Sequence, residues 1–452
     1  MDALTRRRFL EAASAGGVLY AFGHTPGSGF AQAASVAGFS DYKALVCVYL
    51  LGGNDSWSMV VPRSQAEYNA YATSRQNLAI ERDRLLPLTL ADPLPVEYGL
   101  HPSLAALKPQ FDEGQCAFIA NVGPLIAPLT RDQYRSDSGV FPPQLFSHND
   151  QQEQWYTLRG RAQTNTGWAG RLADLLVGQL PGQQLPVNLS LAGNVIMQAA
   201  SKARPYVMGP TGPTTFTAFG TSGVKLDRRN ALTSLVNASY DSIYGRAYSE
   251  TLRNTLASAD AVNSAIAAAP ALQTSFPVSA ALGQQLQTVA RLIAVRERLG
   301  ATRQIFFISA GGYDTHDEQL ALQPGLFSSI ATSLTAFHAA MDELGVGSRV
   351  TTFTQSDFGR TLTSNGDGSD HAWGGLQLVL GGGVRGQAIY GEYPELRIGA
   401  PNDIGGGRFI PAVSSDQYVA TLVRWFGLDE AGISAIAPSI VNFAQKDLGF
   451  MA

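Results

Sequence analysis

The sequence is poor in cysteine, histidine and charge. Its 452 residues include two cysteines and six histidines, and charged residues make up 15%. Two widely separated cysteines, Cys47 and Cys116, argue against a cysteine-based metal site. Both lie in apolar runs, which predicts two buried thiols on strands. A disulfide between them is the alternative, because an oxidising compartment permits one.

The sequence also lacks a surplus of positive charge and a long apolar segment. Its formal net charge is −4, and residues 1–33 hold three arginines and two acids, so their removal gives −5. This mild acidity argues against nucleic acid as the main partner. No later segment has the length and apolarity of a membrane span, so we expect no integral span in the mature chain.

The N-terminus carries a predicted export signal. Arg6 and Arg7 stand before Phe9 and Leu10, a short apolar stretch follows, and Ala31-Gln32-Ala33 offers a small-x-small cleavage site. This order predicts a twin-arginine signal over residues 1–33. It implies a twin-arginine translocase as partner during export and a periplasmic or extracellular location. A basic amphipathic arm or a membrane anchor is the alternative.

Apolar runs alternate with helical patterns in the rest of the chain. Apolar stripes at helical spacing predict helices at 282–293, 327–344 and 418–426. The alternation predicts an α/β fold, with a mostly parallel central sheet and helices on both faces. We expect one domain over 34–452, with 185–275 as a helical or irregular insertion or cap. The predicted strands are 44–51, 116–122, 304–309, 349–354 and 376–380.

Acids and histidines gather where the predicted strands end. The carboxyl ends of parallel strands meet at one edge of a sheet, where ligands bind. Carboxylate and imidazole suit zinc, and oxygen-richer sites suit magnesium, calcium or manganese. We therefore expect one or two divalent metal ions at this edge. Taken singly, the same acids are also typical of helix N-caps and turns. The expected metal ligands are Asp55, Asp314, His316, Asp357, Asp370 and His371.

The few histidines are unevenly placed. Five follow residue 33, and three of them, His148, His316 and His371, lie in the acid-bearing loops. Packing alone does not account for that concentration. The other two, His101 and His338, are predicted to be structural, since His338 adjoins a helical apolar stripe and His101 directly precedes a proline.

In combination, several motifs resemble one family, the bacterial domain of unknown function 1501, whose members carry twin-arginine signals. The resemblance covers roughly residues 43–450. The motifs are Leu-Gly-Gly-Asn-Asp (51–55), Gly-Leu-His-Pro-Ser-Leu (99–104), Ser-His-Asn-Asp-Gln-Gln (147–152), Gly-Trp-Ala-Gly-Arg-Leu (167–172), Gly-Tyr-Asp-Thr-His (312–316), Ser-Asp-Phe-Gly-Arg-Thr (356–361), Asp-His-Ala-Trp-Gly-Gly (370–375) and the tail over 407–443.

That family is similar to the alkaline phosphatase and sulfatase superfamily. The similarity implies a mostly parallel sheet with one or two divalent metals at its C-terminal edge. It also implies a nucleophile at a helix N-terminus, where Ser147 falls. This chain departs from the pattern in three ways. It has fewer histidines than the two-zinc enzymes of the superfamily use. It has Asn149 where family members more often have Phe, and Asp357 where Glu is usual.

Together with these residues, the resemblance implies a metal-dependent hydrolase of phosphate, sulfate or related esters, acting on a small-molecule or glycan ester. Ser147 would attack phosphorus or sulfur. His148 would protonate the leaving group. Arg360 or a second metal would neutralise charge on the transferred group.

A second hypothesis comes from a different class of protein. The fold would serve a secreted binding or structural protein without catalysis, in contact with carbohydrate or the cell envelope. Four aromatic residues, Trp57, Trp155, Tyr156 and Trp168, would form the binding surface. Packing in the core is the other interpretation of these four residues.

Overall fold

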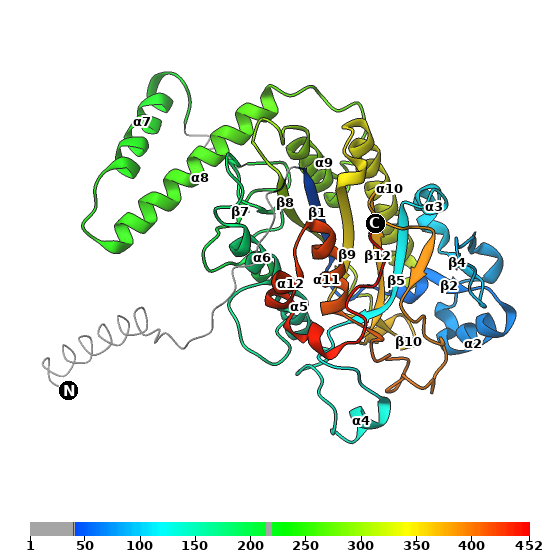
Figure 1. Cartoon of the computed structure of the whole chain (residues 1–452). Coiled ribbons are helices and arrows are strands. Elements are labelled where there is room, and N and C mark those ends of the chain that lie inside the picture. Colours follow the sequence, from blue (N-terminus) through cyan, green and yellow to red (C-terminus); the bar gives the residue numbers. More distant parts are fainter. Residues whose placement is uncertain (1–38, 40, 214–218) are drawn as a thin grey trace, which may run out of the picture. The chain divides into compact units, whose positions relative to one another are not determined.

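The computed structural model describes residues 39, 41–213 and 219–452 (Figure 1). All of them belong to one compact unit, Val36–Ala452. Residues 1–33, the predicted export signal, lie outside the described residues.

A nine-stranded sheet forms the centre of this unit. Its strands are β1 (Lys43–Leu50), β5 (Cys116–Gly123), β6 (Asn188–Ser190), β7 (Tyr206–Val207), β8 (Arg303–Ala310), β9 (Val350–Ser356), β12 (Gly375–Leu380), β13 (Ala388–Tyr390) and β14 (Val413–Ser414). Their order is β13-β5-β12-β9-β1-β8-β6-β7, with β14 beside β5. All neighbours are parallel except β12, which is antiparallel to β5 and β9. The predicted mostly parallel central sheet is confirmed.

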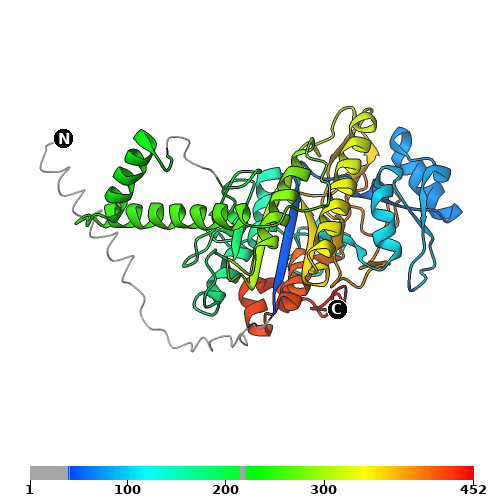
Figure 2. The ribbon, with the colours of Figure 1, turned by 90° about the horizontal axis from the view of Figure 1, so that it is seen from above.

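Helices cover both faces of the sheet because side chains alternate along each strand. In β1, Val46 and Val48 join one hydrophobic core, while Leu45 and Cys47 join the other. Figure 2 shows α10 and α11 on opposite sides of the strands. The first core includes α9 (Ala281–Ala294) and α10 (Gln319–Glu343). The second includes α5 (His148–Thr157), α6 (Trp168–Leu176), α11 (Ser415–Phe426) and α12 (Glu430–Ile436).

The remaining elements lie in connections between the main strands. A three-stranded sheet has the order β2-β4-β3, and β10 pairs with β11 in a hairpin. Their bounds are β2 (Val60–Pro62), β3 (Leu86–Leu88), β4 (Tyr98–Leu100), β10 (Arg360–Ser364) and β11 (Ser369–His371). The further helices are α2 (Gln65–Arg75), α3 (Lys108–Asp112), α4 (Arg131–Arg135), α7 (Gly223–Asn237) and α8 (Ile243–Ala267). None of the described helices is long and apolar enough to cross a membrane.

All five predicted strands and all three predicted helices are present. One of these helices, α10, begins at Gln319, well before its apolar stripe starts at Phe327. Its first two turns carry Gln319 and Gln323, whose amides bind the buried carboxylate of Asp55. The predicted insertion, 185–275, contains the strand β6, the edge strand β7 and then the helices α7 and α8.

The residues expected to be structural are buried. Cys47 and Cys116 are free thiols on β1 and β5, so the alternative of a disulfide between them is wrong. His101 accepts a hydrogen bond from the Ser103 main chain, and His338 bonds to a glutamine side chain. The four aromatic residues considered for carbohydrate binding are buried core residues and provide no binding surface: they are Trp57, Trp155, Tyr156 and Trp168.

Candidate metal centre

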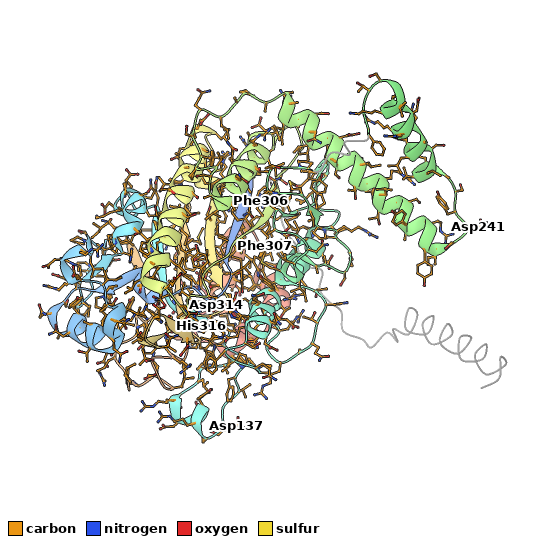
Figure 3. All side chains as sticks on the ribbon, turned by 180° about the vertical axis from the view of Figure 1, so that it is seen from behind. Asp137, Asp241, Phe306, Phe307, Asp314 and His316 are labelled. Atoms are coloured by element: carbon orange, nitrogen blue, oxygen red, sulfur yellow. The ribbon has the colours of Figure 1, made fainter. Side chains whose placement is uncertain are left out.

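The loops that follow β1, β8 and β9 meet at one edge of the sheet. The three strands are adjacent and parallel, so their carboxyl ends lie together. Figure 3 shows Asp314 and His316 beyond the end of β8, the strand that carries Phe306 and Phe307. Because β12 runs the other way, its starting end lies at this edge, and the residues that precede it, Asp370 and His371, arrive there too.

Glycines allow these loops to touch. Gly52 has a φ of 115°, and a Cβ on it would lie 2.4 Å from the main-chain nitrogen of Asp314. Its amide donates to Asp357 Oδ2 at 3.1 Å, and its carbonyl accepts from Arg360 Nη1 at 2.9 Å. A side chain at Gly52 would separate its loop from the loops that carry Asp314 and Asp357.

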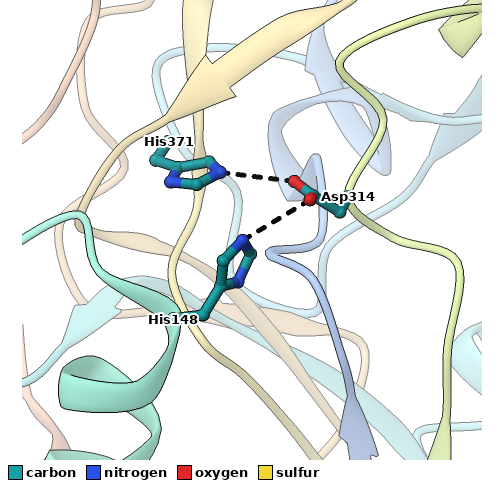
Figure 4. Close-up of side chains that lie close together, drawn as sticks. All are labelled: His148, Asp314 and His371. Atoms are coloured by element: carbon teal, nitrogen blue, oxygen red, sulfur yellow. Dashed lines mark hydrogen bonds and ion pairs between the residues drawn. The ribbon is translucent and has the colours of Figure 1, made fainter.

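Three histidines surround the carboxylate of Asp314. Each of His148, Asp314 and His371 offers one ligand atom, and these three atoms lie within 4.8 Å of one another (Figure 4). His148 Nε2 is 3.5 Å from Asp314 Oδ2, and His371 Nε2 is 3.3 Å from Oδ1. His316 Nε2 lies 3.1 Å from the same Oδ1 and 2.8 Å from His371 Nε2. Among the described residues, His148, Asp314 and His371 therefore form the group compact enough for one ion, and His316 lies beside it.

Each imidazole is oriented by an acceptor on its other nitrogen. Nδ1 of His148 lies 2.7 Å from Asp357 Oδ2, and Nδ1 of His316 lies 3.2 Å from Asp370 Oδ1. Nδ1 of His371 lies 2.8 Å from the main-chain oxygen of Phe146. Ionised carboxylates and carbonyls only accept hydrogen bonds, so we assign the proton of each neutral ring to Nδ1. Every Nε2 lone pair then faces the cluster.

This arrangement fits a divalent cation. Two Nε2 lone pairs at 2.8 Å, beside a carboxylate, repel one another unless a positive charge lies between them. Zinc takes four nitrogen or oxygen ligands in a tetrahedron, whose donor atoms lie about 3.3 Å apart. Metal-bound histidines usually donate their other N–H to a carboxylate or carbonyl, as all three do here. We identify His148, Asp314 and His371 as the residues that fit the ion, with His316 beside them; three protein ligands leave a fourth position for water or substrate.

Electrostatics favour the metal-binding forms of two donors, Asp314 and His371. Burial raises the pKa of Asp314, but the hydrogen bond and charge of Arg360 outweigh it, so this pKa lies below its usual value. Burial, together with the charge of Arg360, lowers the pKa of His371 below its usual value, although the hydrogen bond to the Phe146 main chain acts in the other direction. At neutral pH the carboxylate is therefore ionised and this imidazole is neutral.

Arg360 is a buried residue that positions Asp314. Its side chain is 0% exposed, and Nη1 donates to Asp314 Oδ1 at 2.9 Å. The guanidinium also donates to the main-chain oxygens of Gly52 and Ser369. The sequence predicts that Arg360 neutralises charge on a substrate. In the structure its charge is directed to the carboxylate of Asp314.

Asp55 is not brought together with the histidines. Its Oδ2 accepts hydrogen bonds from Arg75, Ser58, Gln319 and Gln323. The ion pair with Arg75 is buried, with side chains 1% and 0% exposed. The structure therefore places this predicted metal ligand in an ion pair between the β1 loop and α2. Sequence did not reveal the partner, because Arg75 ends an ordinary polar helix.

Ser147 occupies the N-cap position of α5, one residue before His148. Its hydroxyl donates to Asp150 Oδ2 at 2.5 Å and makes no cap hydrogen bond to the helix. Among the described residues, no hydrogen bond joins this hydroxyl to the histidine cluster. The helix nevertheless starts at the cluster, because its first residue is His148.

A pocket of about 460 Å³ opens beside the centre. The sequence did not reveal Tyr134, Phe146, Ile404 and Arg408, because none of them directly follows a strand of the main sheet. One available signal was the run of three glycines directly before Arg408. The lining consists of Tyr134, Phe146, His316, Asp370, His371, Ile404 and Arg408.

Comparison with known proteins places the chain in a family. A family model described as a protein of unknown function, DUF1501, matches residues 42–430. The chain belongs to the DUF1501 family. The DUF1501 match includes every residue of the cluster and of the pocket. No curated protein matches the chain.

We expect the variant Asp357→Asn to weaken zinc binding about 10- to 100-fold, because His148 loses the carboxylate that fixes its tautomer. A competition titration with a chromogenic chelator measures this. Asp342→Asn is the matched control, since that acid lies on α10 and contacts His338 instead. Unchanged affinity in Asp357→Asn would contradict the assignment of His148 as a ligand.

We expect Asp55→Asn to destabilise the protein by about 3–5 kcal/mol, because it leaves Arg75 buried without its partner. The metal content of the folded variant should equal that of the wild type. Urea unfolding and elemental analysis measure the two quantities. A variant that keeps wild-type stability but loses its metal would show that Asp55 is a ligand after all.

Proposed function

We propose that this chain is an exported, metal-dependent hydrolase of phosphate, sulfate or related esters. One observation carries the proposal: three imidazole Nε2 atoms each lie within 3.5 Å of a carboxylate oxygen of Asp314, and each imidazole has its Nδ1 held by an acceptor. Structural metal sites are usually closed, whereas this cluster borders an open pocket, as catalytic sites do.

The cluster would hold one divalent ion, for which zinc fits best, among the zinc, calcium, magnesium or manganese expected. Such an ion supplies Lewis-acid stabilisation of charge on the ester oxygens. The remaining predicted ligands have other parts in this proposal. Asp357 and Asp370 orient His148 and His316 rather than bind the ion directly.

Ser147 is the proposed nucleophile. As Oγ forms its bond to phosphorus or sulfur, its proton passes to Asp150, whose carboxylate already accepts it. The bond to the leaving alcohol oxygen breaks, and the proton passes on to that oxygen. The N-terminal end of α5 favours negative charge on Oγ. Water then hydrolyses the covalent ester. His148, which the sequence predicts as the leaving-group acid, is proposed as a ligand of the ion instead.

The similarity to alkaline phosphatases and sulfatases belongs to this proposal. A mostly parallel sheet, candidate metal ligands at its carboxyl edge and a serine at a helix start support it. Export by the twin-arginine pathway to the periplasm or beyond is proposed from residues 1–33. Export in the folded state would allow the ion to be loaded in the cytoplasm.

We expect purified protein to hold about one equivalent of a transition metal by elemental analysis. It should hydrolyse at least one of 4-nitrophenyl phosphate, bis(4-nitrophenyl) phosphate and 4-nitrophenyl sulfate. A chelator should abolish turnover, and added metal should restore it, since the ion stabilises the transition state. Absence of both bound metal and chelator-sensitive turnover would refute the proposed function.

We expect Ser147→Ala to lower kcat roughly a thousandfold or more, because the covalent step is lost. Its melting temperature and metal content should stay unchanged, since the Ser147 side chain makes no cap hydrogen bond. Ser136→Ala, at the end of α4, is the matched control. Full activity in Ser147→Ala would exclude this nucleophile and leave the metal assignment intact.

A further inference from the structure

The pocket beside the cluster contains a cation that no acid neutralises. Arg408 lines it together with His316, His371 and Asp370. Among the described residues, Arg408 takes part in no ion pair, and no hydrogen bond involves its Nη2. The acid in the pocket lining, Asp370, lies against His316. The charge of Arg360, which does not line the pocket, is directed to Asp314.

Arg408 is nevertheless fixed in position. Its Nε donates to the main-chain oxygen of His371 at 2.9 Å, and Nη1 donates to the main-chain oxygen of Gly405 at 3.2 Å. The buried carboxylate of Asp403 accepts hydrogen bonds from the amides of Gly405 and Gly407 and so holds this loop. A guanidinium held in this way binds an anion with little further loss of conformational freedom.

The rest of the pocket is apolar. Tyr134, Phe146 and Ile404 belong to or border one hydrophobic cluster. The guanidinium carbon of Arg408 lies 5.6 Å from the Phe146 ring centre, and the ring of Tyr134 lies 5.1 Å from that of Phe141. A polyhydroxylated sugar would lose hydrogen bonds to water against such a wall, whereas an aromatic or aliphatic group would lose none.

We infer that Arg408 binds the oxyanion of the ester and that Tyr134, Phe146 and Ile404 receive its organic group. The substrate class is then a phosphate or sulfate ester of an aromatic or otherwise apolar alcohol, not a glycan ester. This inference rests on the proposed function and names the substrate for the same site. Arg408 holds the oxyanion through charge-assisted hydrogen bonds, which suit phosphoryl and sulfuryl oxygens.

The test uses two probes, phenylphosphonate and methylphosphonate, titrated calorimetrically into zinc-loaded protein. We expect the wild type to bind phenylphosphonate roughly tenfold more tightly, because the ring is buried against the apolar wall. Arg408→Gln should weaken binding of both probes about tenfold or more, and Arg408→Lys should retain part of the affinity. Tyr134→Ala should weaken only the binding of phenylphosphonate.

The controls separate charge from structure. Elemental analysis before each titration establishes the metal content, which should match the wild type in all three variants. Wild-type affinity in Arg408→Gln would overturn the inference while leaving chelator-sensitive turnover as support for the proposed function. Loss of metal in both Arg408 variants would overturn it too, because Arg408 would then act by holding His371. Equal effects of Tyr134→Ala on both probes would refute the binding of the organic group by the apolar wall.

A wild type that retains no metal would refute the proposed function, and this inference with it.

Discussion

The fixed Nδ1 proton of each imidazole is the constraint on which the centre depends. A neutral histidine free to turn or to change tautomer would present its lone pair in many directions. Here Asp357, Asp370 and the carbonyl of Phe146 each bind one Nδ1. The three lone pairs therefore point at the carboxylate of Asp314 before any ligand binds. Such preorganisation lowers the entropic cost of assembling a site.

The sheet meets this constraint through its topology. Adjacent parallel strands bring the loops after β1, β8 and β9 together, and the reversal of β12 adds the hairpin that carries His371. The loops can touch only because Gly52 has no side chain. Arg360 then joins two of the loops, since it binds both the carbonyl of Gly52 and the carboxylate of Asp314. The site is thus supported by backbone contacts as much as by side chains.

Sequence patterns predicted the strands, the helices and the residues at the strand ends, because these depend on residues close together in the chain. Strands buried on both faces read as continuous apolar runs, so the central strands and the residues at their ends, such as Asp314 and His316, could be found. Patterns could not reveal partners chosen by tertiary contact. Asp55 follows a strand just as Asp314 does, yet it pairs with Arg75 from α2. Arg408 does not directly follow a strand of the main sheet, and Asp403 holds the loop that brings it to the pocket.

The pairing of the first strand has a consequence for how the protein is made. Both neighbours of β1 lie far along the chain, since Lys43 pairs with Arg303 and Ala44 with Val350. A ribosome must therefore synthesise most of the polypeptide before this apolar strand meets either neighbour. Until then, β1 is an apolar strand with unpaired main-chain groups, which favours aggregation. Pairing between strands so distant in the sequence also makes folding slow. The first strand therefore has neither of its sheet neighbours until synthesis has passed Arg303.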